Sequence, residues 1–191
     1  MNNIKIAKEK DIPSINKIST IVFGSGYESS SYSFIKSLME QDNSYCFVYY
    51  SKRNNIIGFC YGKITTIQNL RNKYPGFKIP FEDLNNEDKV SLSNTMAINP
   101  KHQMRGFGQA LTSYTKEYLN NLGVYQAISP VWKAGSLINA HKLLINNGFF
   151  QYQNLGHYWQ KECDKTQDYC HFRNDNAPCQ CELVFYAKKE L

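Results

Sequence analysis

The chain has 191 residues, which favours a single domain large enough to be stable without disulfides or a metal. Its composition of 42% hydrophobic and 20% charged residues is that of a globular protein, and no apolar run approaches the roughly 20 residues of a transmembrane helix. The net charge of +6 suits a polyanionic ligand, but the basic residues are scattered, so neither a nucleic-acid partner nor a membrane partner is indicated. The polar N-terminus lacks the pattern of a signal peptide, which favours a cytoplasmic location.

The N-terminal part predicts a strand, two helices and a hairpin. Residues 3–7 read as the strand. Asp11 is a good N-cap for the first helix, because apolar residues then recur at helical spacing. Ser33 is expected to cap the second helix. Residues 45–50 and 56–66 are rich in aromatic and β-branched side chains and are joined by a polar turn, which indicates an antiparallel hairpin.

Residues 67–90 fit no regular element. They combine proline and glycine with aromatic and acidic side chains. A loop of this length in a small domain is usually functional or disordered. Two interpretations stay open, a lid beside a substrate and a plain surface insertion.

The middle of the chain predicts a strand over 92–98, a glycine-bearing loop, and an amphipathic helix that runs from about Gly106 to Gly123. The first N–H groups of a helix have no partner inside it, and the helix dipole is positive there, so an anion such as a pyrophosphate fits. Glycine at 106 and 108 lets a phosphate approach, and Arg105 adds positive charge. A tight turn with a solvated basic edge remains the alternative.

The C-terminal part predicts a further strand over 125–132, parallel to the central strand through a right-handed crossover. A helix is expected to open at Gly135-Ser136 and to end at Asn147-Gly148. Residues 149–159 and 182–187 supply the last two strands.

Gln103-x-x-Gly106-x-Gly108, after a strand that ends in an apolar-Asn-Pro corner, resembles the acetyl-CoA motif of the GCN5-related N-acetyltransferases. The resemblance covers roughly residues 2–160. It implies an α/β (α+β) fold, a mixed and mostly antiparallel central sheet of about six to seven strands flanked by helices, with one splayed parallel pair. Residues 1–160 would form the acetyltransferase core, and 161–191 a cysteine-rich segment with the last strand of the same domain.

The resemblance implies that backbone amides of the loop hold the pyrophosphate of acetyl-CoA. A backbone N–H near Ala97 or Ile98 would stabilise the oxyanion. The residues expected to bind the coenzyme are Met96, Ala97, Ile98, Gln103, Met104, Arg105, Gly106, Phe107, Gly108, Gln109, Ser136 and Asn139.

The family transfers an acetyl group to a primary amine by direct attack in a ternary complex. The attacking amine must be neutral, so a general base is needed. The central strand carries no carboxylate, which leaves Glu87, just before it, and His157, on a later strand, as candidates. Leu144 stands where a tyrosine often protonates the leaving thiolate. A non-catalytic acyl-CoA-binding or sensory module is therefore an alternative, and the amine acceptor is left open between small amines, amino acids, antibiotics and protein N-termini.

Four cysteines fall in a polar, turn-rich stretch where a core role is implausible. Structural zinc is the first interpretation, because thiol clusters in a reducing compartment more often bind metal than pair. Reduced thiols and disulfides stay open, as do a zinc-stabilised interaction protein and either a monomer or a homodimer. The candidate ligands are Cys163, Cys170, Cys179 and Cys181, with His171 as a possible substitute, whereas Cys46 and Cys60 are expected in the core.

Overall fold

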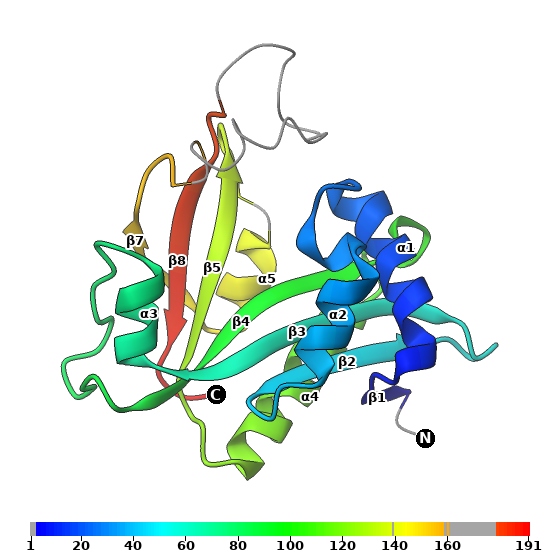
Figure 1. The fold of residues 1–191 in the computed structure, drawn as a ribbon, viewed down its shortest axis with the longest axis horizontal. Coiled ribbons are helices and arrows are strands. Elements are labelled where there is room, and N and C mark those ends of the chain that lie inside the picture. The colour runs from blue at the N-terminus through cyan, green and yellow to red at the C-terminus, as the bar shows by residue number, and fades with distance from the viewer. Residues whose placement is uncertain (1–2, 139, 159, 161–178) are drawn as a thin grey trace. The chain divides into compact units, whose positions relative to one another are not determined.

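The computed structural model describes residues 3–138, 140–158, 160 and 179–191 (Figure 1). The strands follow one another through hydrogen bonds in the order β1-β2-β3-β4-β5-β8-β7, and the short β6 pairs with β5. Pairing is mostly antiparallel, with β4 and β5 parallel, which confirms the predicted fold class. The strands are β1 Ile4–Ile6, β2 Ser44–Tyr50, β3 Ile56–Thr66, β4 Lys89–Ile98, β5 Ala127–Ala134, β6 Leu137–Ile138, β7 Phe150–Asn154 and β8 Glu182–Lys188. The α-helices are α1 Ile12–Phe23, α2 Tyr32–Met39, α3 Ile67–Lys73, α4 Phe107–Asn121 and α5 His141–Asn146, and among the short 3₁₀ turns are η2 Glu28–Ser30 and η3 Pro100–His102.

The described chain divides into two compact units. The first consists of residues 3–62 and 95–116. The second consists of residues 63–94, 117–158, 160 and 179–191. Each unit has its own hydrophobic core.

In the first unit, α1 and α2 cover one face of the strands. Ile12 and Ile15 of α1 and Ile35 of α2 are completely buried, and they pack with Phe59 of β3 and Ala97 of β4. Alternate strand residues point to opposite faces. The buried isoleucines of the helices lie at helical spacing and face these strands, which confirms the predicted amphipathic helices.

The opposite face of these strands is covered by α4. The ring of Phe47 on β2 lies 5.0 Å from that of Tyr114, and the ring of Tyr49 lies 4.9 Å from that of Phe107. Leu111 of α4 is completely buried. These contacts hold α4 against β2, from its first turn at Phe107 to Tyr114.

The caps of α1 and α2 differ from the prediction. Asp11 stands at the N-cap of α1 but makes no capping bond with its side chain. Its carboxylate accepts instead from the Lys8 amide at 2.8 Å and from the Tyr50 hydroxyl at 2.8 Å. The cap of α2 is Ser31, whose hydroxyl accepts from the Phe34 amide, so the prediction of Ser33 was wrong by two residues.

In the second unit, the prediction that residues 67–90 contain no regular element was wrong. Helix α3 begins directly after β3, where the Thr66 hydroxyl caps it by accepting from the Asn69 amide at 3.2 Å. The rings of Tyr74 and Phe77 then lie 5.1 and 5.2 Å from that of Phe185 on β8. The aromatic residues of this segment therefore anchor it in the core of the second unit.

The predicted start of the last helix at Gly135 was also wrong, although the helix ends before Asn147 as predicted. Gly135 has a φ of 58°, and the chain reverses there so that Leu137 pairs with Ala134 in a short hairpin. A positive φ favours glycine, which is the reason for this residue at the turn. Helix α5 then begins only at His141, and β7 ends at Asn154, five residues before the predicted end at residue 159.

The parallel pair of β4 and β5 is confirmed. Ser91 is in register with Ala127, and Leu92 with Ile128. One residue further along, the Ser93 carbonyl accepts from the Ser129 hydroxyl at 3.1 Å. Backbone pairing of the two strands is thus confined to their beginnings.

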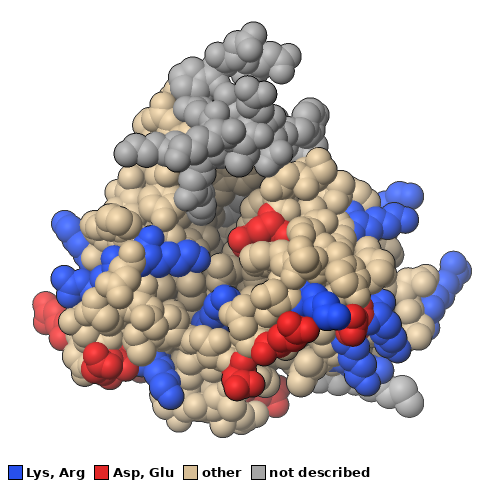
Figure 2. All heavy atoms as spheres, in the orientation of Figure 1, with Lys and Arg blue, Asp and Glu red and all other residues tan. Residues whose placement is uncertain are grey.

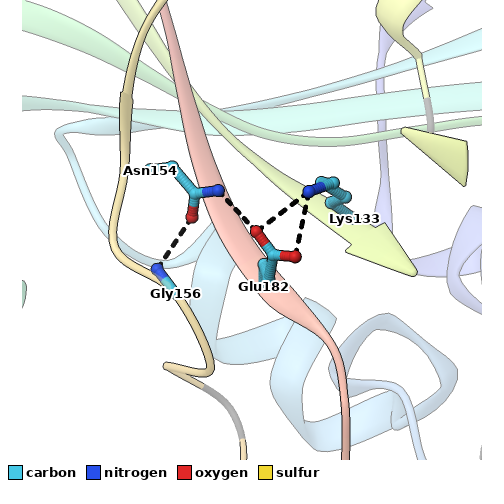
Figure 3. Close-up of polar contacts among 4 residues, drawn as sticks. All are labelled: Lys133, Asn154, Gly156 and Glu182. Carbon is cyan, nitrogen blue, oxygen red and sulfur yellow. Dashed lines mark hydrogen bonds and ion pairs between the residues drawn. The ribbon is translucent and has the colours of Figure 1, made fainter. Parts of the chain in front are cut away.

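A polar cluster ties β5, β7 and β8 together in the second unit (Figure 3). Lys133 reaches both carboxylate oxygens of Glu182, at 2.9 and 3.0 Å. The Asn154 amide group also donates to Glu182 and accepts from the backbone N–H of Gly156. These donors, with Asn154 contributing most and Lys133 next, hold the pKa of Glu182 below its usual range.

We expect Glu182→Gln to lower the stability of the protein in a pH-dependent way. A carboxyl whose pKa is depressed by folding stabilises the folded state above its unfolded pKa of about 4.3, and this contribution is lost as the pH falls through the folded pKa. The melting temperature of the variant should therefore lie below that of the wild type at pH 7, and the two should converge in acid. Glu190→Gln, at an exposed glutamate, is the control and should show no such convergence.

Candidate functional site

The corner between β4 and α4 is held by side chains of the loop itself. The Asn99 side chain accepts from the Lys101 amide at 3.1 Å, and the Asn99 carbonyl accepts from the His102 amide at 2.7 Å. The Gln103 side chain folds back and donates to the Ile98 carbonyl at 3.0 Å. The loop is thereby fastened to the last residue of β4.

Two residues of this loop have left-handed backbone conformations, Met104 with a φ of 60° and Gly106 with a φ of 82°. A Cβ on Gly106 would meet no atom within 4 Å, so the backbone conformation and not packing requires glycine there. A backbone that alternates between left-handed and right-handed residues can aim successive N–H groups at one anion.

The first turn of α4 follows at once. Its first helical hydrogen bond runs from the Ala110 amide to the Gly106 carbonyl, so the amides of Phe107 and Gly108 come before the helical ladder begins. The helix dipole is positive at this end, and Arg105 is an exposed cation beside it. Gly108 carries no side chain that would keep a phosphate away. The corner therefore suits a pyrophosphate.

Most of the residues predicted to bind the coenzyme lie together at this corner. Residues 96–98 end β4, 103–106 form the loop, and 107–109 form the first turn of α4, all in the first unit. Ser136 belongs to the second unit, in the turn between β5 and β6. Asn139 lies outside the described residues.

The two predicted bases belong to the second unit. Glu87 is exposed in the turn before β4, where its amide donates to the Asn85 side chain at 2.9 Å. The glycine loop follows the other end of the same strand. His157 is exposed in the turn after β7. A catalytic role for either residue stays a prediction.

Only part of the cysteine cluster can be placed. Cys163 and Cys170 lie outside the described residues, as does His171. Cys179 and Cys181 are buried directly before β8. Within the described parts of the chain, no three His, Cys, Asp or Glu side chains are grouped to hold a metal ion, and the zinc site stays a prediction.

The two cysteines expected in the core are indeed buried there. Cys46 belongs to the core under α1 and α2, and Cys60 contacts Thr115 of α4 at 3.4 Å. Burial raises the pKa of Cys60 to about 12, so it remains a thiol at neutral pH.

Sequence reasoning missed a cluster of phenols and a carboxylate in the first unit. The Tyr27 hydroxyl shares a hydrogen bond of 2.9 Å with the hydroxyl of Thr95 on β4. The hydroxyl of Tyr61 on β3 donates to the Glu28 carboxylate at 2.8 Å. Tyr27 and Glu28 lie between α1 and α2, in a turn rich in glycine and serine. A tyrosine followed by a glutamate in such a turn is the only sequence feature that could have pointed to this cluster.

Burial governs the acid–base state of the two phenols. It raises the pKa of Tyr27 to about 12, and it also raises the pKa of Tyr61. Both side chains therefore stay protonated near neutral pH, and Tyr61 donates its hydrogen bond to Glu28.

The surface charge gives no second candidate on the face drawn in Figure 2, where Lys and Arg groups lie among Asp and Glu groups. This mixture agrees with the scattered basic residues of the sequence. Among the helices that the structure describes, none has the length and apolar character needed to cross a bilayer.

Comparison with known proteins places the fold. No family model matches the chain, and no curated protein matches it by sequence. Among solved structures, Arabidopsis thaliana NAA60 in complex with acetyl-CoA is similar with a TM-score of 0.70 and 13% identity over 97% of this chain and 96% of that chain. The Escherichia coli ribosomal-protein-S18-alanine N-acetyltransferase is similar with a TM-score of 0.65 and 14% identity over 100% and 96%.

A third similar structure is Chaetomium thermophilum Naa20 in complex with a bisubstrate analogue, with a TM-score of 0.65 and 12% identity over 98% of this chain and 86% of that chain. At these identities the likeness establishes the fold and nothing finer. The chain thus has the fold of the GCN5-related N-acetyltransferases, as its loop motif predicted.

Proposed function

We propose that this chain is an N-acetyltransferase that moves an acetyl group from acetyl-CoA to a primary amine. The observation that supports it most is the β4–α4 corner. It combines two left-handed residues, Met104 and Gly106, with a helix start that bears Gly108 and the exposed cation Arg105. This corner would bind the pyrophosphate of the coenzyme through backbone amides.

In this proposal the acceptor attacks directly in a ternary complex. The nitrogen lone pair forms a bond to the thioester carbonyl carbon, the C–S bond breaks, and its electron pair leaves with sulfur as the coenzyme A thiolate. The backbone of β4 at Ala97 and Ile98 would stabilise the oxyanion. The protein contributes position and electrostatics, because the coenzyme itself carries the reactive acyl group.

One observation favours a second candidate, a non-catalytic acyl-CoA-binding module. Leu144 is buried in an apolar cluster of the second unit, at the place where family members often have a proton-donating tyrosine. Such a module would bind acetyl-CoA without transferring the acetyl group.

We also propose, from the sequence alone, a cytoplasmic location and a structural zinc site for this chain.

Coenzyme A release measured by mass spectrometry, across a panel of amines and peptides, tests the proposal. One of the similar structures, Naa20, is a complex with a bisubstrate analogue and another is named for a ribosomal-protein alanine, so peptides with a free α-amine belong in the panel beside small amines. Thiol dyes are unsuitable because the protein has six cysteines.

We expect release that depends on an acceptor. Binding of acetyl-CoA without release for any acceptor would support the non-catalytic module. Absence of both binding and release would show that the glycine loop is only a turn.

A further inference from the structure

We infer that Glu28 binds the acceptor's reactive amine in its ammonium form and accepts the proton that this amine must lose. The inference rests on the proposed function and identifies the acceptor as a cationic amine. It replaces the bases expected from the sequence with a residue of the turn between α1 and α2.

The Glu28 carboxylate is oriented by the protein. The residue is exposed, yet its Oε1 accepts a hydrogen bond of 2.8 Å from Tyr61, which is 2% exposed. A carboxylate held from the protein side and open on the other is oriented before a ligand arrives. Less conformational entropy is then lost on binding than for a mobile surface glutamate.

Glu28 differs from a similar glutamate, Glu9, in its charged partners. Glu9 is the natural comparison, because its carboxylate also accepts from a phenol, that of Tyr32, at 3.0 Å. Glu9 is neutralised by Lys36 at 2.9 Å. The described partner of Glu28 is a phenol whose pKa is raised and which therefore stays neutral. Among the described residues no cation is paired with Glu28, so an incoming ammonium ion would meet no competing cation there.

The turn that carries Glu28 is held rigidly by hydrogen bonds. The hydroxyls of Ser19 and Ser29, both completely buried, share a hydrogen bond of 2.6 Å. Ser30 donates to the Ser19 hydroxyl at 3.0 Å and to the Gly24 carbonyl at 2.8 Å. The Asn16 side chain donates to the Ser29 carbonyl at 2.8 Å. This network fastens η2, and with it Glu28, to α1.

The turn that carries Glu28 lies next to β4. The same turn is tied to β4 by the hydrogen bond of Tyr27 to Thr95, and Thr95 directly precedes the strand end proposed to face the thioester. Aromatic rings stand beside both phenols. The ring of Phe23 lies 4.6 Å from that of Tyr27, and the ring of Phe34 lies 5.8 Å from that of Tyr61. These ring contacts help to hold the two phenols in place.

The proton step is simple. The acceptor R–NH₃⁺ transfers one proton to the Glu28 carboxylate, giving R–NH₂ and the neutral carboxylic acid. The freed lone pair then attacks the thioester carbonyl carbon, and the C–S bond breaks as described above. The bonded nitrogen then loses its second proton, which protonates the departing thiolate of coenzyme A through solvent, and the proton on Glu28 returns to solvent.

Glu28→Gln tests the inference, with Glu9→Gln as the matched control because Glu9 is also paired with a tyrosine in the same unit. Acetyl-CoA binding is measured by calorimetry, and acceptor kinetics with the panel amine that gives the wild type its fastest release. We expect Glu28→Gln to keep the Kd for acetyl-CoA within about twofold. The acceptor kcat/KM should fall about 100-fold, with the KM for the acceptor raised. Glu9→Gln should behave as the wild type.

Two further variants separate a chemical role from a structural one. Glu28→Asp retains the carboxylate and should recover part of the lost kcat/KM. Tyr61→Phe releases the carboxylate without removing it and should cost less than Glu28→Gln, whereas Tyr32→Phe should cost nothing. Unchanged acceptor kinetics in Glu28→Gln would overturn the inference and leave the proposed function standing. A wild type that releases no coenzyme A with any amine would overturn both.

Discussion

Replacing Arg105 by Glu together with Gly108 by Val should weaken the binding of acetyl-CoA at least about 100-fold, which corresponds to about 2.7 kcal/mol. The first change puts a carboxylate where an exposed cation now lies next to the helix start. An anion repelled at this end also loses the attraction of the helix dipole. The second change puts a β-branched side chain in the first turn of α4, where it would keep a phosphate from the backbone amides.

The effect should be on binding and not on folding. Arg105 is exposed and Gly108 is partly exposed, and neither belongs to the core cluster under α1 and α2, so the melting temperature should change little. Lys17→Glu, an exposed site on α1, controls for the charge change, and Ser113→Val, an exposed site further along α4, controls for a valine in this helix. Calorimetry should give both control variants the wild-type Kd. A double variant at Arg105 and Gly108 that still binds acetyl-CoA tightly would show that the corner does not hold the pyrophosphate.

The β4–α4 corner was predictable because its information is local. The strand, the Asn99-Pro100 break, the glycines and the amphipathic helix follow one another within residues 92–123. Each feature acts on its own backbone, through a removed donor, a positive φ or a helical stripe of apolar residues. Only the hydrogen bonds by which Gln103 and Asn99 fasten the loop could not be predicted in this way, and the structure shows them.

Helix α3 and strand β6 were missed because packing decided them. Helix α3 has seven residues, fewer than an isolated helix needs to be stable, and its buried Ile67 and Leu70 supply the stabilisation. Strand β6 has two residues and exists because the turn at Gly135 returns it to β5. Periodicity over windows of 11–18 residues cannot detect either element.

The cluster around Glu28 was missed for a related reason. Its members come from the turn after α1, from β3 and from β4, and they are separated by 33 to 68 positions in the chain. Alternation along a strand predicts which residues share a face, but not which residue of a distant turn lies above it. The central strand carries no carboxylate, and Glu28 follows Tyr27 in a turn that is hydrogen-bonded to that strand at Thr95.

The second large effect is expected at Gly58 on β3. A Cβ built there would overlap Ile98 Cδ1 and would lie 3.1 Å from the Ala97 carbonyl oxygen. The side chain of Ile98 can rotate away, but the backbone oxygen cannot. Strands β3 and β4 are held together at this point by the bond from the Asn99 amide to the Ile57 carbonyl at 2.8 Å. Gly58→Ala should therefore destabilise the protein by about 1–3 kcal/mol, and Gly58→Val by more.

Chemical denaturation of a double-mutant cycle can separate the two contacts. Ile98→Val removes Cδ1, so Gly58→Ala should cost less in the Ile98→Val background than in the wild type, by at least about 0.5 kcal/mol. The cost that remains reports the approach to the Ala97 carbonyl. Equal costs in both backgrounds would mean that Ile98 moves aside freely and that the backbone contact alone requires glycine. No cost in either would show that β3 and β4 are further apart at Gly58 than the structure places them.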